Sequence, residues 1–224
     1  MKQFFLSLFL LFPMIYEAQT AEQTAEQIIE KHLEVTGGVE KWKDFRTSVI
    51  YGMMVLGNNE KYPLEIYQKR PNLTKTLITV KGKQFTLSGY NGKEAVQFDS
   101  QTGELKLDPN YNPEAFESDL LDFANKGFQA VLQGNETVNG SDCFKIQLSK
   151  DKAVTTYYFD TKTYQLVKET TFGQSTFYSD FKEVSGLTFP FKIEEKNAKG
   201  KTNLTLIISL IGVNKTLSSK TFKF

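Results

Sequence analysis

The chain has 224 residues, of which 40% are hydrophobic and 13% aromatic, and its 27 basic side chains nearly balance its 26 acidic ones. A near-neutral charge gives no support for a nucleic acid or an anionic membrane as the partner. The length suits one domain with a full core, and β barrels of this size commonly form a single domain. The high aromatic content favours strands and apolar cavities.

The N-terminus has the pattern of an export signal. A short basic start, Met1-Lys2-Gln3, precedes an apolar run over residues 4–16, which is shorter than the ~20 residues of a membrane-spanning helix. We predict a signal peptide over residues 1–20, with Ala18 or Thr20 as the last residue removed, and a single mature domain over residues 21–224. No cysteine lies there to accept a lipid anchor, so we expect a soluble, monomeric periplasmic protein.

The sequence offers little support for catalysis. Cys143 is the single cysteine and lies in an alternating strand pattern, where a small buried apolar residue is expected. His32 is the single histidine and lies on the apolar face of a predicted helix, so we expect it to pack rather than to bind metal. The sequence contains no nucleophile elbow, metalloprotease, P-loop or dinucleotide motif. We therefore expect no enzyme activity, no cofactor and no metal.

A helix followed by a long series of strands is predicted. Apolar residues at helical spacing from Ala25 to Leu33 predict a helix that ends at Gly37-Gly38. From Phe45 the hydrophobic period becomes two, and tight turns such as Asn91-Gly92 indicate sequential antiparallel hairpins. The predicted strands span residues 47–56, 62–69, 73–80, 84–90, 94–99, 143–148, 154–160, 166–172, 175–181, 187–193 and 203–213.

The segment 108–134 interrupts the strands. Within it, Phe116, Leu120 and Phe123 recur at helical spacing, which predicts an amphipathic helix over residues 114–128. Such a helix could cover the core of a sheet, or it could form a lid over a cavity. The two roles are compatible, and both place its apolar face against the sheet.

Several predicted strands are apolar on both faces, whereas a soluble antiparallel sheet normally has one polar face. Both faces therefore need cover, and one could line a cavity for an apolar ligand. In the strand 47–56, one face carries Val49, Tyr51, Met53 and Val55, and the other carries Ile50, Met54 and Leu56. We predict that Tyr51, Met53 and Val55 bind an apolar ligand together with Phe116, Leu120 and Phe123.

A family resemblance extends over nearly the whole mature chain. Its segments include Lys69-Arg70-Pro71-Asn72-Leu73, Gly89-Tyr90-Asn91-Gly92-Lys93 and Gly186-Leu187-Thr188-Phe189-Pro190. In this order they resemble the LolA/LolB-like family of outer-membrane lipoprotein carriers. Only two of the 27 basic residues are arginines, which suggests that position 70 needs a planar cation with several donors.

The resemblance implies a mainly β (α+β) fold, an unclosed antiparallel barrel of about ten or more strands with helices as a lid over an apolar cavity. It also implies that the protein carries lipid or the acyl chains of a lipidated protein, bound non-covalently, toward the outer membrane. Partner proteins at the inner and outer membranes would then hand over and receive the cargo. Arg70 would bond to the lid and steady its closed form. The alternative is a periplasmic sensor or regulatory module that binds a partner protein on the same scaffold.

Overall fold

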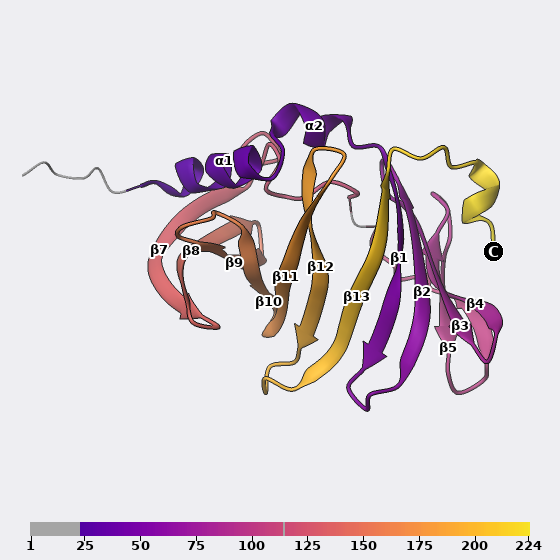
Figure 1. The fold of residues 1–224 in the computed structure, drawn as a ribbon. Coiled ribbons are helices and arrows are strands. Elements are labelled where there is room, and N and C mark those ends of the chain that lie inside the picture. The colour runs from indigo at the N-terminus through magenta and orange to yellow at the C-terminus, as the bar shows by residue number, and fades with distance from the viewer. Residues whose placement is uncertain (1–22, 114) are drawn as a thin grey trace, which may run out of the picture.

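The computed structural model describes residues 23–113 and 115–224 (Figure 1). The predicted signal peptide, residues 1–20, lies outside the described residues. Within the described part of the chain, no helix has both the length and the apolar character needed to cross a bilayer.

Two short helices precede the sheet. Helix α1 (Ala25–Val35) begins at Thr24, whose side chain accepts a hydrogen bond from the Gln27 backbone while the Gln27 side chain accepts one from Thr24. Helix α2 (Val39–Asp44) follows after Gly37 and Gly38. Gly37 has a φ of 132°, and a Cβ there would lie 2.5 Å from the Gly186 carbonyl oxygen. Glycine therefore allows the junction of the helices to lie directly on the turn at Gly186.

In the described residues, thirteen antiparallel strands form one sheet in the order β6-β5-β4-β3-β2-β1-β13-β12-β11-β10-β9-β8-β7. Strands that follow one another in the sequence pair with each other, except β6 and β7, which are the two edges of the sheet. The first and last strands, β1 and β13, also pair. The strands are β1 (Thr47–Leu56), β2 (Lys61–Lys69), β3 (Leu73–Val80), β4 (Lys83–Tyr90), β5 (Ala95–Asp99), β6 (Glu104–Leu107), β7 (Gln129–Val138), β8 (Ser141–Lys150), β9 (Ala153–Asp160), β10 (Leu166–Thr171), β11 (Gln174–Val184), β12 (Leu187–Lys196) and β13 (Thr202–Val213).

The prediction of a mainly β, unclosed antiparallel barrel is confirmed. Each of the eleven predicted strands corresponds to an observed strand, whereas β6, β7 and α2 were not predicted. The segment 108–128 connects the two edge strands, so it crosses the gap that keeps the barrel open. The course of the chain therefore places this connector where a cavity between the two halves of the sheet would open.

The predicted helix over residues 114–128 is wrong for the residues described. Residues 115–128 form a series of turns, with Asp122 at φ 59° and Gly127 at φ 84°. The Ser118 hydroxyl accepts a hydrogen bond from the Leu120 backbone, which competes with helical bonding. Leu120 and Leu121 are both buried in the core cluster beneath α1, so tertiary packing holds these turns in place. The connector is therefore a packed loop, and the expected helical lid is absent from the described residues.

One face of the sheet forms the inner surface. Helix α1 packs on it through Ile28 and Ile29, which meet the fully buried Ile146 and Phe159 of β8 and β9. Residues that pair directly across neighbouring strands lie on the same face, so the pairing identifies the inner face from β9 to β1. Its residues include Tyr157, Glu169, Thr176, Glu195, Leu204 and Leu56. On the opposite face, the 3-10 helix η1 (Ser219–Phe222) lies beside β3 and buries Phe222. The inner face therefore holds the main core and the space that α1 leaves uncovered.

Candidate functional site

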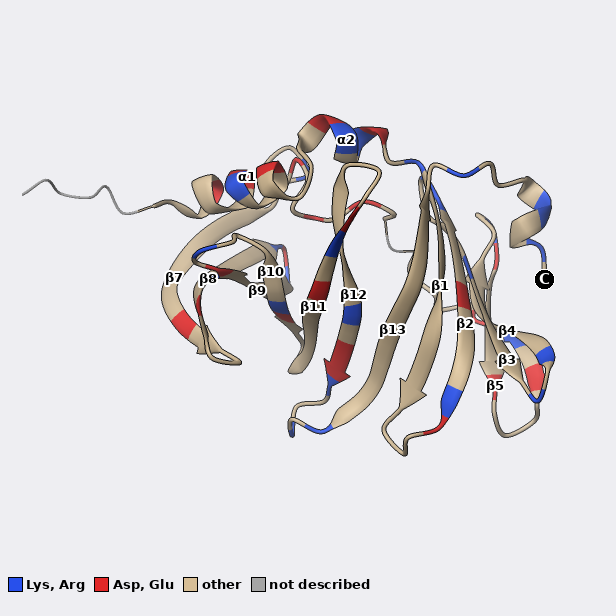
Figure 2. Cartoon of the chain, in the orientation of Figure 1, with Lys and Arg blue, Asp and Glu red and all other residues tan. Residues whose placement is uncertain are grey.

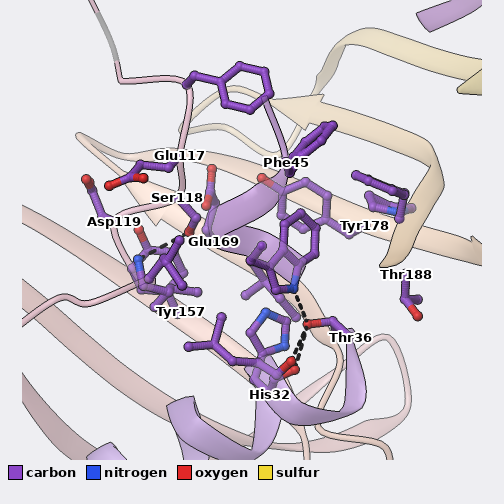
Figure 3. A pocket seen from close by; sticks show the side chains of 18 of the residues that line it. His32, Thr36, Phe45, Glu117, Ser118, Asp119, Tyr157, Glu169, Tyr178 and Thr188 are labelled. Atoms are coloured by element: carbon purple, nitrogen blue, oxygen red, sulfur yellow. Dashed lines mark hydrogen bonds between the residues drawn. The ribbon is translucent and has the colours of Figure 1, made fainter. Parts of the chain in front are cut away.

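A cavity of about 640 Å³ lies between the helices, the connector and strands β9 to β12. Figure 3 shows Glu117, Ser118 and Asp119 of the connector on one side of it and His32 and Thr36 of the α1 segment on another. Its apolar lining residues are Leu33, Trp42, Phe45, Ala115, Phe116, Leu120, Leu121, Leu166, Phe181, Phe189 and Pro190. Its polar lining residues are His32, Thr36, Arg70, Glu117, Ser118, Asp119, Thr155, Tyr157, Glu169, Thr171, Tyr178 and Thr188.

Four aromatic rings form one wall of the cavity. The Phe45 ring lies 4.8 Å from the Phe116 ring and 5.6 Å from the Phe189 ring, and Trp42 lies 5.4 Å from Phe189. These centroid distances are typical of tilted and edge-to-face packing, which fixes the ring positions. The Trp42 indole N–H donates to the Thr36 hydroxyl over 3.1 Å. The wall is therefore preformed and presents apolar surface to any occupant.

The strands supply polar groups to the cavity. Tyr157 and Glu169 face each other on β9 and β10, and the Tyr178 hydroxyl of β11 bonds to Glu169. Burial, followed by the charge of Glu169, raises the pKa of both tyrosines above the usual value. Both hydroxyls therefore stay protonated at neutral pH and act as hydrogen-bond donors. The cavity is amphipathic, because aromatic rings and hydroxyl and carboxylate groups both line it.

His32 packs at the edge of the cavity. Its Nδ1 lies 2.9 Å from the Tyr164 carbonyl oxygen, and its ring lies 5.0 Å from that of Phe159. The carbonyl fixes the tautomer with the proton on Nδ1. Burial lowers the pKa of His32 to about 4, against the opposing effect of the Tyr164 hydrogen bond. His32 is therefore neutral at physiological pH and helps to anchor α1 to the β9–β10 turn.

We expect the protein to lose stability as pH falls through the range 6.5 to 4 because of His32. The unfolded chain binds a proton near the ordinary pKa of 6.5, whereas the folded chain does so only at about 4, so protons favour unfolding in this window. The loss of folding stability that His32 causes reaches about 3 kcal/mol at the acidic end of this pH range. Urea unfolding of wild type and His32→Leu at several pH values measures it. An equally steep fall in both proteins would assign the pH dependence to other groups.

Arg70 joins the connector to the start of the barrel. Its Nε donates to the Phe45 carbonyl over 2.7 Å, a terminal nitrogen donates to the Trp42 carbonyl over 3.0 Å, and the other terminal nitrogen pairs with Glu117. The guanidinium also lies 5.6 Å from the centre of the Phe116 ring. Hydrogen bonds from Lys126 and from Arg70 lower the pKa of Glu117. One guanidinium thus links the C-terminal end of α2 and the connector at the cavity.

The residues predicted from the sequence divide between two places. Phe116, Leu120 and Arg70 line the cavity, and Phe123 packs against the core cluster beneath α1. Tyr51, Met53 and Val55 do not line it, because they pair with Leu210, Ile207 and Thr205 on the opposite face of the sheet. On that face Tyr51 is 37% exposed and Leu210 is 56% exposed. Ligand contact by the six predicted residues and gating by Arg70 stay predictions.

Sequence reasoning missed the polar lining of the cavity, above all Tyr157, Glu169 and Tyr178. Their strands were predicted, but tyrosine and glutamate at alternating positions are common on solvent-facing sheet surfaces. The register alone brings these three side chains to the inner face. The strand pattern held no signal that could have found them, because Glu169 and Thr171 on one face also fit a solvent-facing surface.

Comparisons with known proteins place the fold. No known family and no curated protein matches the sequence. Among solved structures, a DUF1329 family protein from Desulfovibrio piger matches 90% of this chain and 98% of its own, with 12% identity and a TM-score of 0.58. A LolA superfamily protein from Nitrosomonas europaea matches 91% and 99%, with 14% identity and a TM-score of 0.56.

An outer membrane lipoprotein-sorting protein domain from Vibrio parahaemolyticus matches 87% of this chain and 97% of its own, with 16% identity and a TM-score of 0.53. These matches cover nearly the whole of each structure at low sequence identity. The likeness is therefore one of architecture, and it agrees with the resemblance found in the sequence. The chain has a LolA-like fold.

Proposed function

We propose that the chain is a periplasmic carrier that binds one amphiphile, either a lipid or the acyl part of a lipidated protein, in the cavity beneath the connector. The observation that carries this proposal is the cavity itself, whose volume of about 640 Å³ falls within the ~300–1,000 Å³ of small-molecule sites. Its aromatic wall suits an acyl chain, and its tyrosine and glutamate side suits a polar end. The fold shared with lipoprotein-sorting proteins adds support, and transfer toward the outer membrane follows by analogy.

Non-covalent binding without catalysis is part of the proposal. Tyr157 and Tyr178 have raised pKa values, so they stay protonated at neutral pH and are weak proton donors in acid–base catalysis. The Nδ1 of His32 is held by the Tyr164 carbonyl, and the His32 pKa is lowered to about 4. Among residues 23–113 and 115–224, no group of three acidic, cysteine or histidine side chains is placed to hold a metal. Tyr157, Tyr178 and His32 therefore suit hydrogen bonding to the polar end of a bound ligand better than proton transfer.

Displacement of an apolar dye tests the proposal. Purified mature protein is titrated with N-phenylnaphthylamine, whose fluorescence rises in apolar surroundings, and a palmitoyl lysophospholipid is then added as competitor. We expect saturable binding of one dye per chain and full displacement by the lipid. Folded protein that neither binds the dye saturably nor releases it to the lipid would contradict a carrier. That result would favour the alternative of a module that binds a partner protein on the same scaffold.

A further inference from the structure

We propose that the turns at the end of the half-barrel distant from α1 and α2 form a docking surface for a bilayer with anionic head groups, into which Phe172 inserts. The proposal does not depend on what occupies the cavity. It rests on three adjacent turns, one exposed aromatic side chain in an unusual backbone conformation, and a local excess of lysine.

The three turns lie side by side. They connect β8 to β9 at residues 151–152, β10 to β11 at residues 172–173, and β12 to β13 at residues 197–201. Thr155 pairs with Thr171, which brings the first turn next to the second. A Cβ at Gly173 would lie 3.6 Å from that of Ala198, which brings the second turn against the third. Figure 1 shows the second and third turns together at the lower end of the sheet.

Phe172 occupies the tip of the second turn and contributes little to the core. It is 87% exposed, and Val154 on the neighbouring strand is 39% exposed. Phe172 has a φ of 48° and Gly173 one of 76°, so the two-residue turn has the conformation that favours asparagine followed by glycine. A bulky side chain at positive φ is unfavourable. Neither local conformation nor burial accounts for phenylalanine here, so a contact outside the chain is the remaining physical reason.

The two turns beside Phe172 carry exposed lysines. Lys152, Lys199 and Lys201 are exposed, and Asp151 is the acidic residue in the three turns. In the described part of the chain none of these lysines forms an ion pair. The whole chain has a net charge of +1, so this excess is local; Figure 2 shows blue at the β12–β13 turn.

The third turn is held in place by its own hydrogen bonds. The Asn197 side chain accepts from the Lys199 and Lys201 backbones over 3.0 and 3.1 Å. The Asn197 N–H also donates to the Lys201 carbonyl over 3.0 Å. The turn thus presents both lysines from a fixed backbone beside the aromatic tip.

A bilayer fits this arrangement better than a folded partner. A single ring that projects from a turn offers little area for a protein interface, whereas an aromatic ring enters the interfacial region of a bilayer readily. Lysines beside it reach the head groups with their ammonium ends while their methylene stems lie along apolar surface. Each lysine near an anionic surface strengthens binding, and salt weakens that contribution. The surface therefore suits the binding of lipid with negative head groups.

Vesicle co-sedimentation tests the surface with the mature protein. Vesicles of phosphatidylethanolamine with phosphatidylglycerol are compared with vesicles of phosphatidylethanolamine with phosphatidylcholine. We expect binding to the first, and about a ten-fold lower partition coefficient for Phe172→Asn. We expect a loss of about ten-fold or more for Lys199→Gln with Lys201→Gln. The matched controls, Leu107→Asn at the exposed edge strand and Lys31→Gln with Lys43→Gln in the helices, are expected to bind as wild type does.

A tryptophan at position 172 locates the contact directly. Phe172→Trp fluorescence is expected to shift to shorter wavelength with the anionic vesicles and to be quenched by brominated acyl chains, while Leu107→Trp changes little. Equal binding to both vesicle types, or binding that survives Phe172→Asn and the lysine changes, would overturn the proposal. Asparagine suits the turn, so Phe172→Asn is expected to keep the wild-type melting temperature. The Phe172→Asn and Lys199→Gln with Lys201→Gln variants are expected to bind the apolar dye as wild type does, because these residues do not line the cavity, which separates this proposal from the proposed function.

Discussion

Replacing Arg70 by leucine is expected to speed the release of a bound amphiphile by about ten-fold while leaving the barrel folded. Arg70 forms the ion pair between the barrel and Glu117 and also holds the Phe45 and Trp42 carbonyls. A hydrogen bond to a charged group contributes about 1.5–3 kcal/mol. The side chains of Arg70 and Glu117 are partly exposed, so we expect their bond to contribute an amount near the low end of this range. A loss of about 1.4 kcal/mol changes an equilibrium ten-fold. Stopped-flow measurement of dye release gives the rate.

The chain offers a matched control for this change. Arg46 is the other arginine, and its side chain is 67% exposed, with Asp44 3.9 Å away. Arg46→Leu is expected to release the dye at the wild-type rate. Arg70→Lys keeps the charge but cannot supply three donors in one plane, so it is expected to lie between leucine and wild type. If Arg70→Leu released the dye at the wild-type rate and showed unchanged hydrogen exchange over residues 115–119, Arg70 would have no gating role.

Filling the cavity is expected to abolish ligand binding. Thr171 lines the cavity at the end of β10, and its hydroxyl lies 3.0 Å from that of Thr155. Thr171→Trp places an indole in the space between the aromatic wall and the tyrosines. Tryptophan suits a strand, so we expect a folded protein with at least a ten-fold weaker affinity for the dye, because the added ring occupies the volume of the ligand. Equilibrium titration measures the affinity, and circular dichroism the melting temperature.

Thr170→Trp is the control for this variant. Thr170 precedes Thr171 in the same strand, so its side chain points to the opposite face of the sheet, where its hydroxyl lies 3.0 Å from that of Ser175. Dye affinity is expected to stay at the wild-type value. Equal loss of affinity in both variants would show that a bulky residue in β10 disturbs the sheet, and undiminished affinity in Thr171→Trp would place the binding site elsewhere.

Most strands could be predicted because hairpins depend on local sequence. Turn pairs such as Asn139-Gly140 and Lys81-Gly82 mark the ends of neighbouring strands, and the period of two marks the strands themselves. The pairing of β1 with β13 has no such local signal. It joins Met53 to Ile207 across most of the chain, and it decides which two strands become the edges. The position of the opening, and hence of the cavity, follows from this long-range pairing.

The errors at the site have the same origin. In strand 47–56 both faces are apolar, so the pattern could not tell that Met54 faces the core beside Leu64 while Met53 lies on the other face. In the connector, the spacing of Phe116, Leu120 and Phe123 fitted a helix, but the chain forms turns there, with Asp122 at positive φ. Arg70 was identified because arginine is rare in this chain and because the surrounding motif resembles a known family.

Native mass spectrometry tests the central claim most directly. The protein is produced with its own N-terminal segment, purified from the periplasmic fraction without detergent, and analysed beside Thr171→Trp. We expect the wild-type chain to carry the added mass of one amphiphile, solvent extraction to recover acyl chains, and Thr171→Trp to carry none. Wild-type protein that is folded and has the mass of the bare chain, with no extractable lipid, would contradict the account.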